Sequence, residues 1–302
     1  MSIKPGAILN HRYEVVRNLG EGATSTVYLV RDKREKGEMW ALKQLTHSPE
    51  EDERESLLRE VGFLSTLEHE NLVRLVDYFV QYGWDFLVME RVMGPTLQEI
   101  IDESRHPLYE SDVVEYALQV CRVLSYLHRQ DPPVIYRDLK PGNIMITVQG
   151  HLKLIDLGIA RHFNPMKPKD TTPLGTPGYC PPEQYGFGQT TQRSDIYSLG
   201  ATLYHALTLQ DPADFKFDFP PITQFNGNLS EPTIEIIHKC LMKSPEDRFE
   251  NTDILYDNLM ELKNLLAHQS NNTGFRMKMK IKNYHKKIRR IVTKFLTGKE
   301  ID

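Results

Sequence analysis

The stretch VIYRDLKPGNIMI, residues 134–146, places several polar side chains in one short loop between apolar segments. The acid Asp138 is followed two residues later by Lys140 and five residues later by the amide Asn143. An acid alone in such a loop is most often a turn cap. Burying an unpaired charge is unfavourable, so charges held this close to a core rarely serve only as solvated surface. The stretch therefore marks a candidate chemical site.

A second acid follows the same loop. Asp156 comes thirteen residues after Asn143 and closes the apolar run Leu154-Ile155 before Leu157-Gly158. A carboxylate in this position can ligate a hard cation, although by itself it also fits a turn cap.

A buried ion pair is predicted nearer the N-terminus. The period of two in a predicted strand places Lys43 on the same face as Ala41 and Leu45, where a lysine is usually a strand-edge charge. Glu60, however, falls on the apolar face of the next predicted helix and needs a cation, for which Lys43 is the nearest candidate. With this pair present, the turn-cap interpretation of the two aspartates becomes improbable.

A glycine-containing stretch lies between the first two predicted strands. It reads Leu19-Gly20-Glu21-Gly22-Ala23-Thr24-Ser25-Thr26-Val27. Glycines let the backbone approach a phosphate closely, but a two-glycine hairpin is more often only a turn.

Around these motifs the pattern changes from β-rich to helical. Strands are predicted at Tyr13–Leu19, Thr26–Val30, Met39–Leu45, Leu72–Phe79 and Asp85–Glu90, with one helix from Ser48 to Leu67. After Gly94-Pro95, helical spacing extends from Val113 to Leu127, and Ile196–Leu207 is apolar nearly all round. We expect an α+β fold with a small antiparallel β lobe followed by a larger helical lobe.

Composition narrows the class of protein. The 302 residues, 40% hydrophobic and 26% charged, fit a globular chain and support neither a disordered nor a fibrous one. No apolar run reaches the length of a membrane span, and no apolar signal core opens the chain, so a cytoplasmic protein without a transmembrane segment is expected. Cys121, Cys180 and Cys240 lack disulfide or metal-type spacing and are expected to be reduced thiols.

Charge is concentrated at the C-terminus. Residues 270–302 hold ten Lys/Arg and two acids, a net charge of +8. Because the whole chain has a net charge of −4, the remaining residues carry −12. The pattern of residues 275–298 predicts a surface-seeking amphipathic helix. Its target is an anionic membrane surface, a partner groove or DNA, or else it docks on the helical lobe with its lysines facing the acidic body. DNA would leave the apolar stripe unused. The stripe consists of Met277, Ile281, Tyr284, Ile288, Ile291 and Phe295.

Together the motifs resemble those of eukaryotic-type (Hanks-type) protein serine/threonine kinases of the bacterial sort. The resemblance runs over 13–268, with an N lobe at about 13–90, a C lobe at about 91–268, and the basic tail 269–302 beyond it. It implies transfer of the γ-phosphoryl group of ATP to Ser/Thr hydroxyls of protein substrates, with Mg²⁺ or Mn²⁺ as the metal.

The resemblance also implies roles for the polar residues. The glycine loop covers the ATP phosphates, Lys43 holds the α- and β-phosphates and pairs with Glu60, and Asn143 and Asp156 hold the metal ions. Asp138 resembles the aspartate that orients the substrate hydroxyl in this family. The lysine at position 140 faces the γ-phosphate and is usually lacking in tyrosine kinases.

The adenine pocket is carried over in the same way. Residues 86–92 resemble the hinge, with Met89 as gatekeeper and the backbone of Glu90 and Val92 against adenine. The side chains that would enclose the ring are Leu19, Val27, Ala41 and Met145.

Residues 175–183 resemble the peptide-docking end of an activation segment, with Thr176 near the catalytic aspartate. Asp195 resembles the helix aspartate that anchors the catalytic loop, and Arg248 the partner of Glu183. Arg137 resembles the arginine that pairs with a phosphate on the activation segment, so autophosphorylation is expected at Thr171 or Thr172.

Four residues depart from the family pattern, namely Ser25, Tyr136, Leu157 and Pro181, and none removes a charge that the reaction needs. The alternatives are a pseudokinase scaffold, an adaptor acting through its basic tail, and a small-molecule kinase. The complete set of charged residues argues against the first, and the peptide-docking segment argues against the last.

Overall fold

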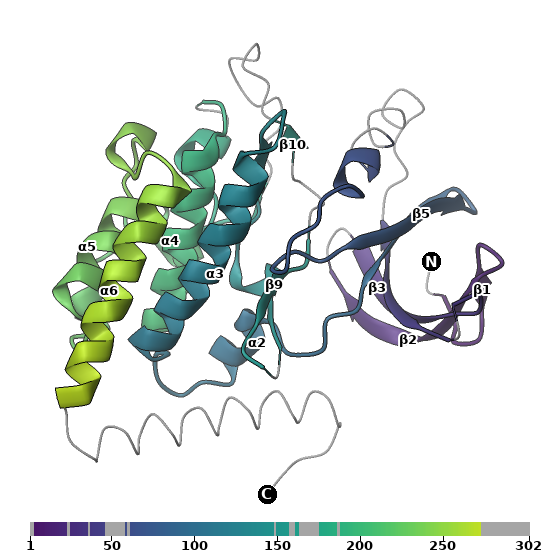
Figure 1. Ribbon diagram of the computed structural model, residues 1–302, viewed down its shortest axis with the longest axis horizontal. Coiled ribbons are helices and arrows are strands. Elements are labelled where there is room, and N and C mark those ends of the chain that lie inside the picture. Colours follow the sequence, from purple (N-terminus) through teal and green to yellow (C-terminus); the bar gives the residue numbers. More distant parts are fainter. Residues whose placement is uncertain are drawn as a thin grey trace, which may run out of the picture. The chain divides into compact units, whose positions relative to one another are not determined.

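The chain folds into two compact units, Met1–Val92 and Met93–Asp302, in the computed structural model (Figure 1). We call them unit 1 and unit 2. The residues that the structure describes are 3–22, 25–35, 37–45, 58, 61–147, 149–156, 161–162, 175–185 and 188–272.

Unit 1 is built on a six-stranded antiparallel sheet in the order β1-β2-β3-β4-β6-β5. The strands are β1 (Ile8–Leu9), β2 (Tyr13–Glu21), β3 (Ser25–Asp32), β4 (Met39–Leu45), β5 (Leu75–Gln81) and β6 (Trp84–Glu90). β1 was not among the predicted strands. β5 begins at Leu75, whereas the prediction began the strand at Leu72. Leu72 and Val73 are buried, which accounts for their apolar character, but they are not part of the strand.

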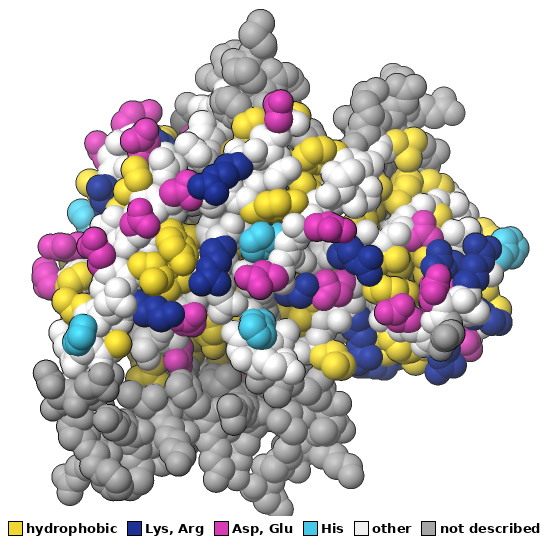
Figure 2. Space-filling view, viewed as in Figure 1, with side chains coloured by type: hydrophobic (Ala, Val, Ile, Leu, Met, Phe, Trp, Pro, Cys, Tyr) yellow, Lys and Arg dark blue, Asp and Glu magenta, His cyan; other side chains and the backbone are white. Residues whose placement is uncertain are grey.

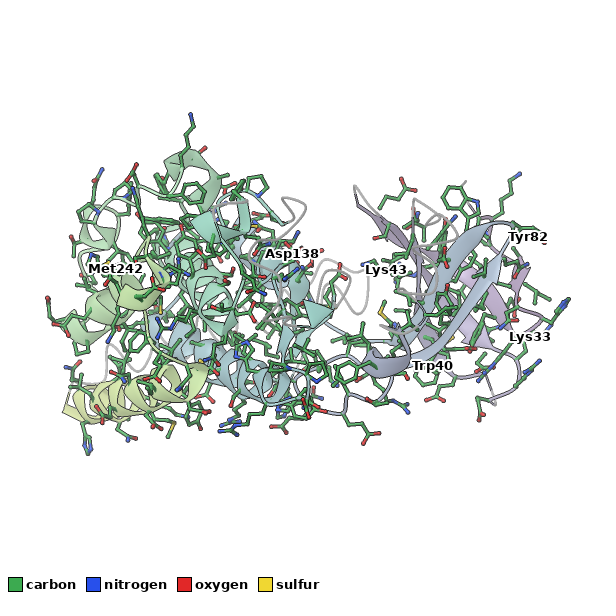
Figure 3. The ribbon with its side chains drawn as sticks, turned by 90° about the horizontal axis from the view of Figure 1, so that it is seen from above. Lys33, Trp40, Lys43, Tyr82, Asp138 and Met242 are labelled. Carbon is green, nitrogen blue, oxygen red and sulfur yellow. The ribbon has the colours of Figure 1, made fainter. Side chains whose placement is uncertain are left out.

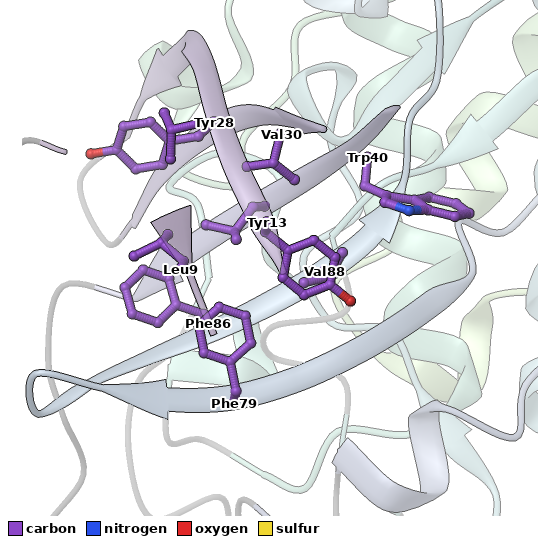
Figure 4. Close-up of a cluster of buried hydrophobic side chains, with 10 residues drawn as sticks. Leu9, Tyr13, Tyr28, Val30, Trp40, Phe79, Phe86 and Val88 are labelled. Atoms are coloured by element: carbon purple, nitrogen blue, oxygen red, sulfur yellow. The ribbon is translucent and has the colours of Figure 1, made fainter. Parts of the chain in front are cut away.

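One face of this sheet carries the core of unit 1 (Figure 4). Tyr13 stacks on Phe79 with ring centroids 5.8 Å apart, and Phe79 stacks on Phe86 at 5.0 Å. The Tyr13 hydroxyl donates a hydrogen bond to Asp77 Oδ2 at 2.7 Å, so the polar end of this buried ring has a partner. The aromatic residues that predict strands in the sequence thus also fill the core.

The predicted helix from Ser48 to Leu67 lies mostly outside the described residues. Residues 61–64 are helical, and a turn follows at 65–66. Glu60, the predicted partner of Lys43, lies outside the described residues.

Unit 2 is mainly helical, as the sequence predicts. Its helices are α2 (Leu97–Asp102), α3 (Glu110–His128), α4 (Gln192–Thr208), α5 (Glu231–Cys240) and α6 (Thr252–Asn272). Its strand pairs are β7 (Val134–Ile135) with β10 (Arg161–His162) and β8 (Ile144–Ile146) with β9 (Leu152–Leu154). Short 3₁₀ helices occur at η1 (Pro141–Asn143), η2 (Pro182–Tyr185), η3 (Pro212–Phe215), η4 (Ile222–Gln224) and η5 (Pro245–Asp247).

α4 is the central helix of unit 2. Every residue from Ser194 to Thr208 is buried, in agreement with the apolar run predicted there. The helix starts at a capping box in which the Thr191 side chain and Ser194 bond reciprocally to each other's backbone N–H. α3 and α5 pack against it and give it a fixed position in the unit.

The remaining helices are tied together at both ends of α3. Ser125 Oγ donates to Asp253 Oδ1 at 2.6 Å, and Lys263 Nζ lies 2.6 Å from Glu115 Oε2, so α6 runs antiparallel to α3. At the start of α3, Glu110 Oε1 accepts hydrogen bonds from the backbone N and side chain of Ser230 at the start of α5.

The described helices include none with the length and apolar character needed to cross a bilayer. The three cysteines are buried free thiols, as predicted.

Candidate active site

The loop after β7 is held by the carboxylate of Asp195, which lies on α4 and is fully buried. Asp195 accepts hydrogen bonds from the backbone N of Tyr136 at 2.9 Å and of Arg137 at 2.8 Å, and it shares a third, of 2.7 Å, with His128 Nε2. Arg137 has a φ of 69°, a left-handed conformation that is unfavourable for a long side chain. The anchoring contact that the resemblance implies for Asp195 is therefore present, and it stabilises this backbone.

Gln184 provides a second contact to the same residue that the sequence does not predict. Its Nε2 donates to the carbonyl oxygen of Arg137 at 3.0 Å, and the side chain is buried. Gln184 lies on η2, directly after Glu183, so the segment around η2 is hydrogen-bonded to the loop after β7.

The Glu183–Arg248 pair fixes η2 in turn. Arg248 Nη1 and Nη2 donate to Glu183 Oε1 and Oε2 at 2.7 and 3.0 Å, a bidentate contact that is almost completely buried. Ser194 Oγ also donates to Glu183 Oε1, at 2.7 Å. The predicted partnership of Arg248 and Glu183 is present in the structure.

The polar residues of the loop converge on Asp138, which is buried with 8% exposure. Its Oδ2 lies 3.0 Å from Lys140 Nζ and accepts a hydrogen bond from Asn143 Nδ2 at 2.9 Å. Its Oδ1 accepts a hydrogen bond from Thr176 Oγ1 at 2.8 Å, and Lys140 also donates to this hydroxyl. Four predicted site residues thus form one connected group.

Asp156 lies next to this group. The backbone N of Ile155 donates to the carbonyl oxygen of Asn143 at 3.0 Å, so the candidate metal ligands Asn143 and Asp156 are on adjoining segments. Burial raises the pKa of the Tyr136 phenol well above its ordinary value, and the negative charges of Asp156 and Asp138 add to this increase. The phenol therefore stays neutral beside two carboxylates.

These residues fit a divalent ion that is held partly by its substrate. The described residues contain no group of three or more His, Cys, Asp or Glu that could hold a metal alone. Asn143 Nδ2 donates to Asp138, which leaves the amide oxygen of Asn143 as its metal-binding atom. One carboxylate and one amide oxygen, completed by phosphate oxygens and water, are a ligand set that suits Mg²⁺.

In unit 1 the candidates for nucleotide binding share one face of the sheet. Lys43 lies opposite Val27 of β3, and Ala41 lies opposite Met89 of β6. Opposed residues and alternate residues along a strand point to the same side, so these four side chains lie on the face opposite the aromatic core. Lys43 is 6% exposed.

The glycine loop is described at its two ends. Gly20 is opposite Val27, and the backbone N of Gly22 donates to the carbonyl oxygen of Ser25 at 2.8 Å, which closes the turn. Leu19 is 39% exposed, and Glu21 is exposed. Ala23 and Thr24 lie outside the described residues.

The other predicted residues are placed as follows. Glu90 is the last residue of β6 and Val92 the last of unit 1, while Met145 lies on β8 of unit 2 and is half-buried. The side chain of Arg137 is buried. Thr171 and Thr172 lie outside the described residues, as does Leu157.

A protein kinase domain model matches residues 13–260. The chain belongs to the protein kinase family. This kinase is 30% identical over 275 residues to a probable serine/threonine-protein kinase of Clostridium acetobutylicum, a match that covers 86% of this chain and 41% of the relative. It is 30% identical over 262 residues to the serine/threonine-protein kinase PrkC of Bacillus subtilis, a match that covers 82% of this chain and 40% of PrkC.

A solved structure agrees with this assignment. The crystal structure of the Mycobacterium tuberculosis PknI kinase domain matches with a TM-score of 0.71 at 26% identity, and covers 86% of this chain and 99% of that one. The predicted resemblance to bacterial serine/threonine kinases and the predicted kinase fold are therefore confirmed. The kinase family implies ATP and a divalent metal ion. The chain spans about two fifths of the length of the two curated relatives.

Proposed function

We propose that this chain is an active protein serine/threonine kinase that transfers the γ-phosphoryl group of ATP to Ser or Thr hydroxyls of protein substrates. The observation that carries the proposal is the Asp138 group, in which one buried carboxylate contacts Lys140, Asn143 and Thr176. A scaffold without turnover would not require this set of charges to be held together.

Each residue of the group has a chemical task in the proposal. Asp138 accepts a hydrogen bond from the substrate hydroxyl and orients its oxygen toward the phosphorus atom. Lys140 stabilises the negative charge on the transferred group. Asn143 and Asp156 would hold Mg²⁺, or Mn²⁺, which when bound neutralises charge on the phosphate oxygens.

Unit 1 would supply the nucleotide contacts. We assign the phosphates to the glycine loop and to Lys43, with Glu60 as its partner. The adenine ring is assigned to the backbone of Glu90 and Val92. The apolar side chains assigned to the ring are Leu19, Val27, Ala41, Met89 and Met145.

Removal of the central charges tests the proposal. In an assay with ATP, Mg²⁺ and a generic basic protein, we expect Asp138→Asn to lower kcat by about 100- to 10,000-fold, because general-base groups contribute rates of this size. Lys43→Met and Asp156→Ala should reduce transfer to a similar or greater extent. Asp257→Asn is the matched control, since Asp257 is exposed on α6. Turnover of Asp138→Asn near the parent rate, with an unchanged melting temperature, would refute the role of Asp138. Absence of phosphoryl transfer by the parent protein itself would favour the scaffold.

The identity of the phosphorylated residue tests the role of Lys140. Phosphoserine and phosphothreonine should dominate the acid hydrolysate of the product, and a predominance of phosphotyrosine would contradict the assignment. We also propose that the kinase phosphorylates itself at Thr171 or Thr172. Mass spectrometry of active protein in which both are unmodified would exclude this.

We further propose that the tail 275–298 binds an anionic membrane surface and thereby keeps a cytoplasmic kinase at the membrane. Its support is the apolar stripe, because duplex DNA would use only the basic residues. At roughly 1 kcal/mol per basic residue, a variant with Lys282, Lys286, Arg289 and Arg290 changed to Gln should bind anionic vesicles about 4 kcal/mol more weakly. Retardation of duplex DNA without vesicle binding would identify the nucleoid as the target instead.

A further inference from the structure

Unit 2 contains an apolar pocket that the proposed reaction does not use. It lies between residues 217–223, which follow η3, and helix α5, and it has a volume of about 380 Å³. Figure 3 shows Met242, one of its lining residues, well away from Asp138. The lining includes Tyr204, Phe217, Ile234, Leu241 and Met242. We call it the α5 pocket.

The chain leaves α6 near the start of α5. α6 runs antiparallel to α3 from Asp253 beside Ser125 to Lys263 beside Glu115, so its last residues lie near the start of α3. The start of α3 is in turn hydrogen-bonded to the start of α5 through Glu110. Figure 1 shows α5 and α6 next to each other.

The sequence beyond α6 is long enough to reach the pocket. Met277, the first residue of the apolar stripe, comes five residues after Asn272, and five extended residues span about 17 Å. The ten residues of α5 extend over about 15 Å. From its exit beside the start of α5, the stripe can therefore reach the α5 pocket along its whole length.

Acidic side chains that a basic occupant can pair with lie around the pocket, together with the basic lining residues His238 and Lys243. Glu231 and Glu235 are exposed on α5, three residues before and one residue after the lining residue Ile234. Asp218 lines the rim with a side chain that is 78% exposed and pairs with Lys243. Figure 2 shows Asp and Glu side chains gathered over the end of unit 2 where α5 and α6 lie. The tail, with its balance of +8, is the complementary segment of this chain.

We infer that the α5 pocket is an intramolecular binding site for the apolar stripe of the tail. Side chains of the stripe fill the pocket, and the basic residues of the tail face Glu231, Glu235 and Asp218. Both a membrane and the pocket need the same apolar side chains, so the two compete for the tail. The pocket binds the tail whether or not the chain is catalytically active.

Hydrogen–deuterium exchange of the full-length chain tests the inference. Ile281→Asp, in the stripe, should accelerate the exchange of backbone amides in residues 217–223 and 234–241. This variant leaves every contact among the described residues in place, so a change there reports on the tail. Ile254→Asp is the matched control, because Ile254 is 39% exposed in the first turn of α6. It should leave the exchange of both segments unchanged.

The reciprocal variant is Ile234→Asp, which should abolish protection across residues 277–296 while the melting temperature stays unchanged. If Ile234→Asp does not fold, the Ile281→Asp result decides alone. Equal exchange of residues 217–223 and 234–241 in the parent and in Ile281→Asp overturns the inference. Protection that disappears on dilution also overturns it, since the occupant would then be a second copy of the chain.

Vesicles separate this inference from the proposed membrane binding. Addition of anionic phosphatidylserine vesicles should accelerate exchange in residues 217–223 and 234–241, because lipid removes the stripe from the pocket. A chain that sediments with vesicles without such a change retains its membrane function and refutes the pocket. A chain that does not sediment, but responds to Ile281→Asp, retains the pocket and refutes the membrane function.

Discussion

Thr176 connects the two charged residues at the centre of the site. Its hydroxyl donates to Asp138 and accepts from Lys140, so it holds the carboxylate and the ammonium group in one orientation. Hydrogen bonds to charged groups contribute about 1.5–3 kcal/mol. We therefore expect Thr176→Val, which keeps the shape, to lower kcat roughly tenfold to a hundredfold. Steady-state kinetics will measure this effect.

Thr176→Ser is the control, because it keeps the hydroxyl and should retain most of the parent kcat. If Thr176→Val is as active as the parent, the hydroxyl does not position Asp138. An equal loss of activity in both variants would instead point to the methyl group.

Sequence reasoning at this scale finds the charged residues and, through the resemblance, the supports Asp195 and Glu183–Arg248, but it misses Gln184. Asp138, Lys140 and Asn143 stand out because three polar types share one loop between apolar segments. Gln184 carries no comparable signal, since a neutral amide after Glu183 looks like any surface residue. Its amide bonds the carbonyl oxygen of Arg137, whose positive φ cannot be inferred from an arginine in the sequence.

Among the elements, α4 packs closely against the end of α5 at Gly200. A Cβ added at Gly200 would lie 2.6 Å from Cys240 Cβ, and the backbone carbon of Cys240 is 3.4 Å away. Replacement of a helical glycine by alanine normally favours the helix by about 1 kcal/mol. Here overpacking should prevail, and we expect Gly200→Ala to reduce the free energy of unfolding by about 1–3 kcal/mol in urea titrations.

Gly227→Ala is the control for this substitution. A Cβ at Gly227 would have only Thr223 O within 4 Å, at 3.9 Å, so its stability should match that of the parent. A Gly200→Ala protein more stable than the parent would show that α4 and α5 can move apart.

Helices and strands could be predicted where the periodicity of their apolar residues is strong. The all-round apolar run in α4 and the aromatic strands of unit 1 were correctly predicted, because burial and periodicity agree there. Strands of two or three residues such as β7 and β9 are too short to show a period. The predicted start of β5 was wrong because a buried apolar residue such as Leu72 looks the same in the sequence whether or not it belongs to a strand.

For the molecule as a whole, burial of tyrosine predicts sensitivity to alkaline pH. Burial raises the pKa of Tyr204 to about 12 and that of other core tyrosines further, against about 10 for an exposed tyrosine. Because the folded-state pKa values are raised, stability is complete below pH about 10 and decreases as the pH rises through them. The tyrosines whose pKa is raised further than that of Tyr204 are Tyr13, Tyr116, Tyr136, Tyr179 and Tyr197.

The measurement is the free energy of unfolding in urea, at neutral pH and above pH about 10, alongside the ultraviolet absorption of tyrosinate. We expect a loss of stability only in the alkaline series, with delayed ionisation of the native protein. Ionisation of all tyrosines near their ordinary pKa, without loss of stability, would contradict this.

The order of the strands in unit 1 has a consequence for how the protein is made. All sheet neighbours except β4 and β6 are consecutive in sequence, and unit 1 ends at Val92, whereas α4 begins only at Gln192. A ribosome adding about 5–20 residues per second needs roughly 5–20 s to synthesise the segment from Val92 to Gln192. Nascent chains stalled at Gly150 should therefore already resist protease in unit 1. The newborn protein thus has a finished sheet while the helix at the centre of its larger unit does not yet exist.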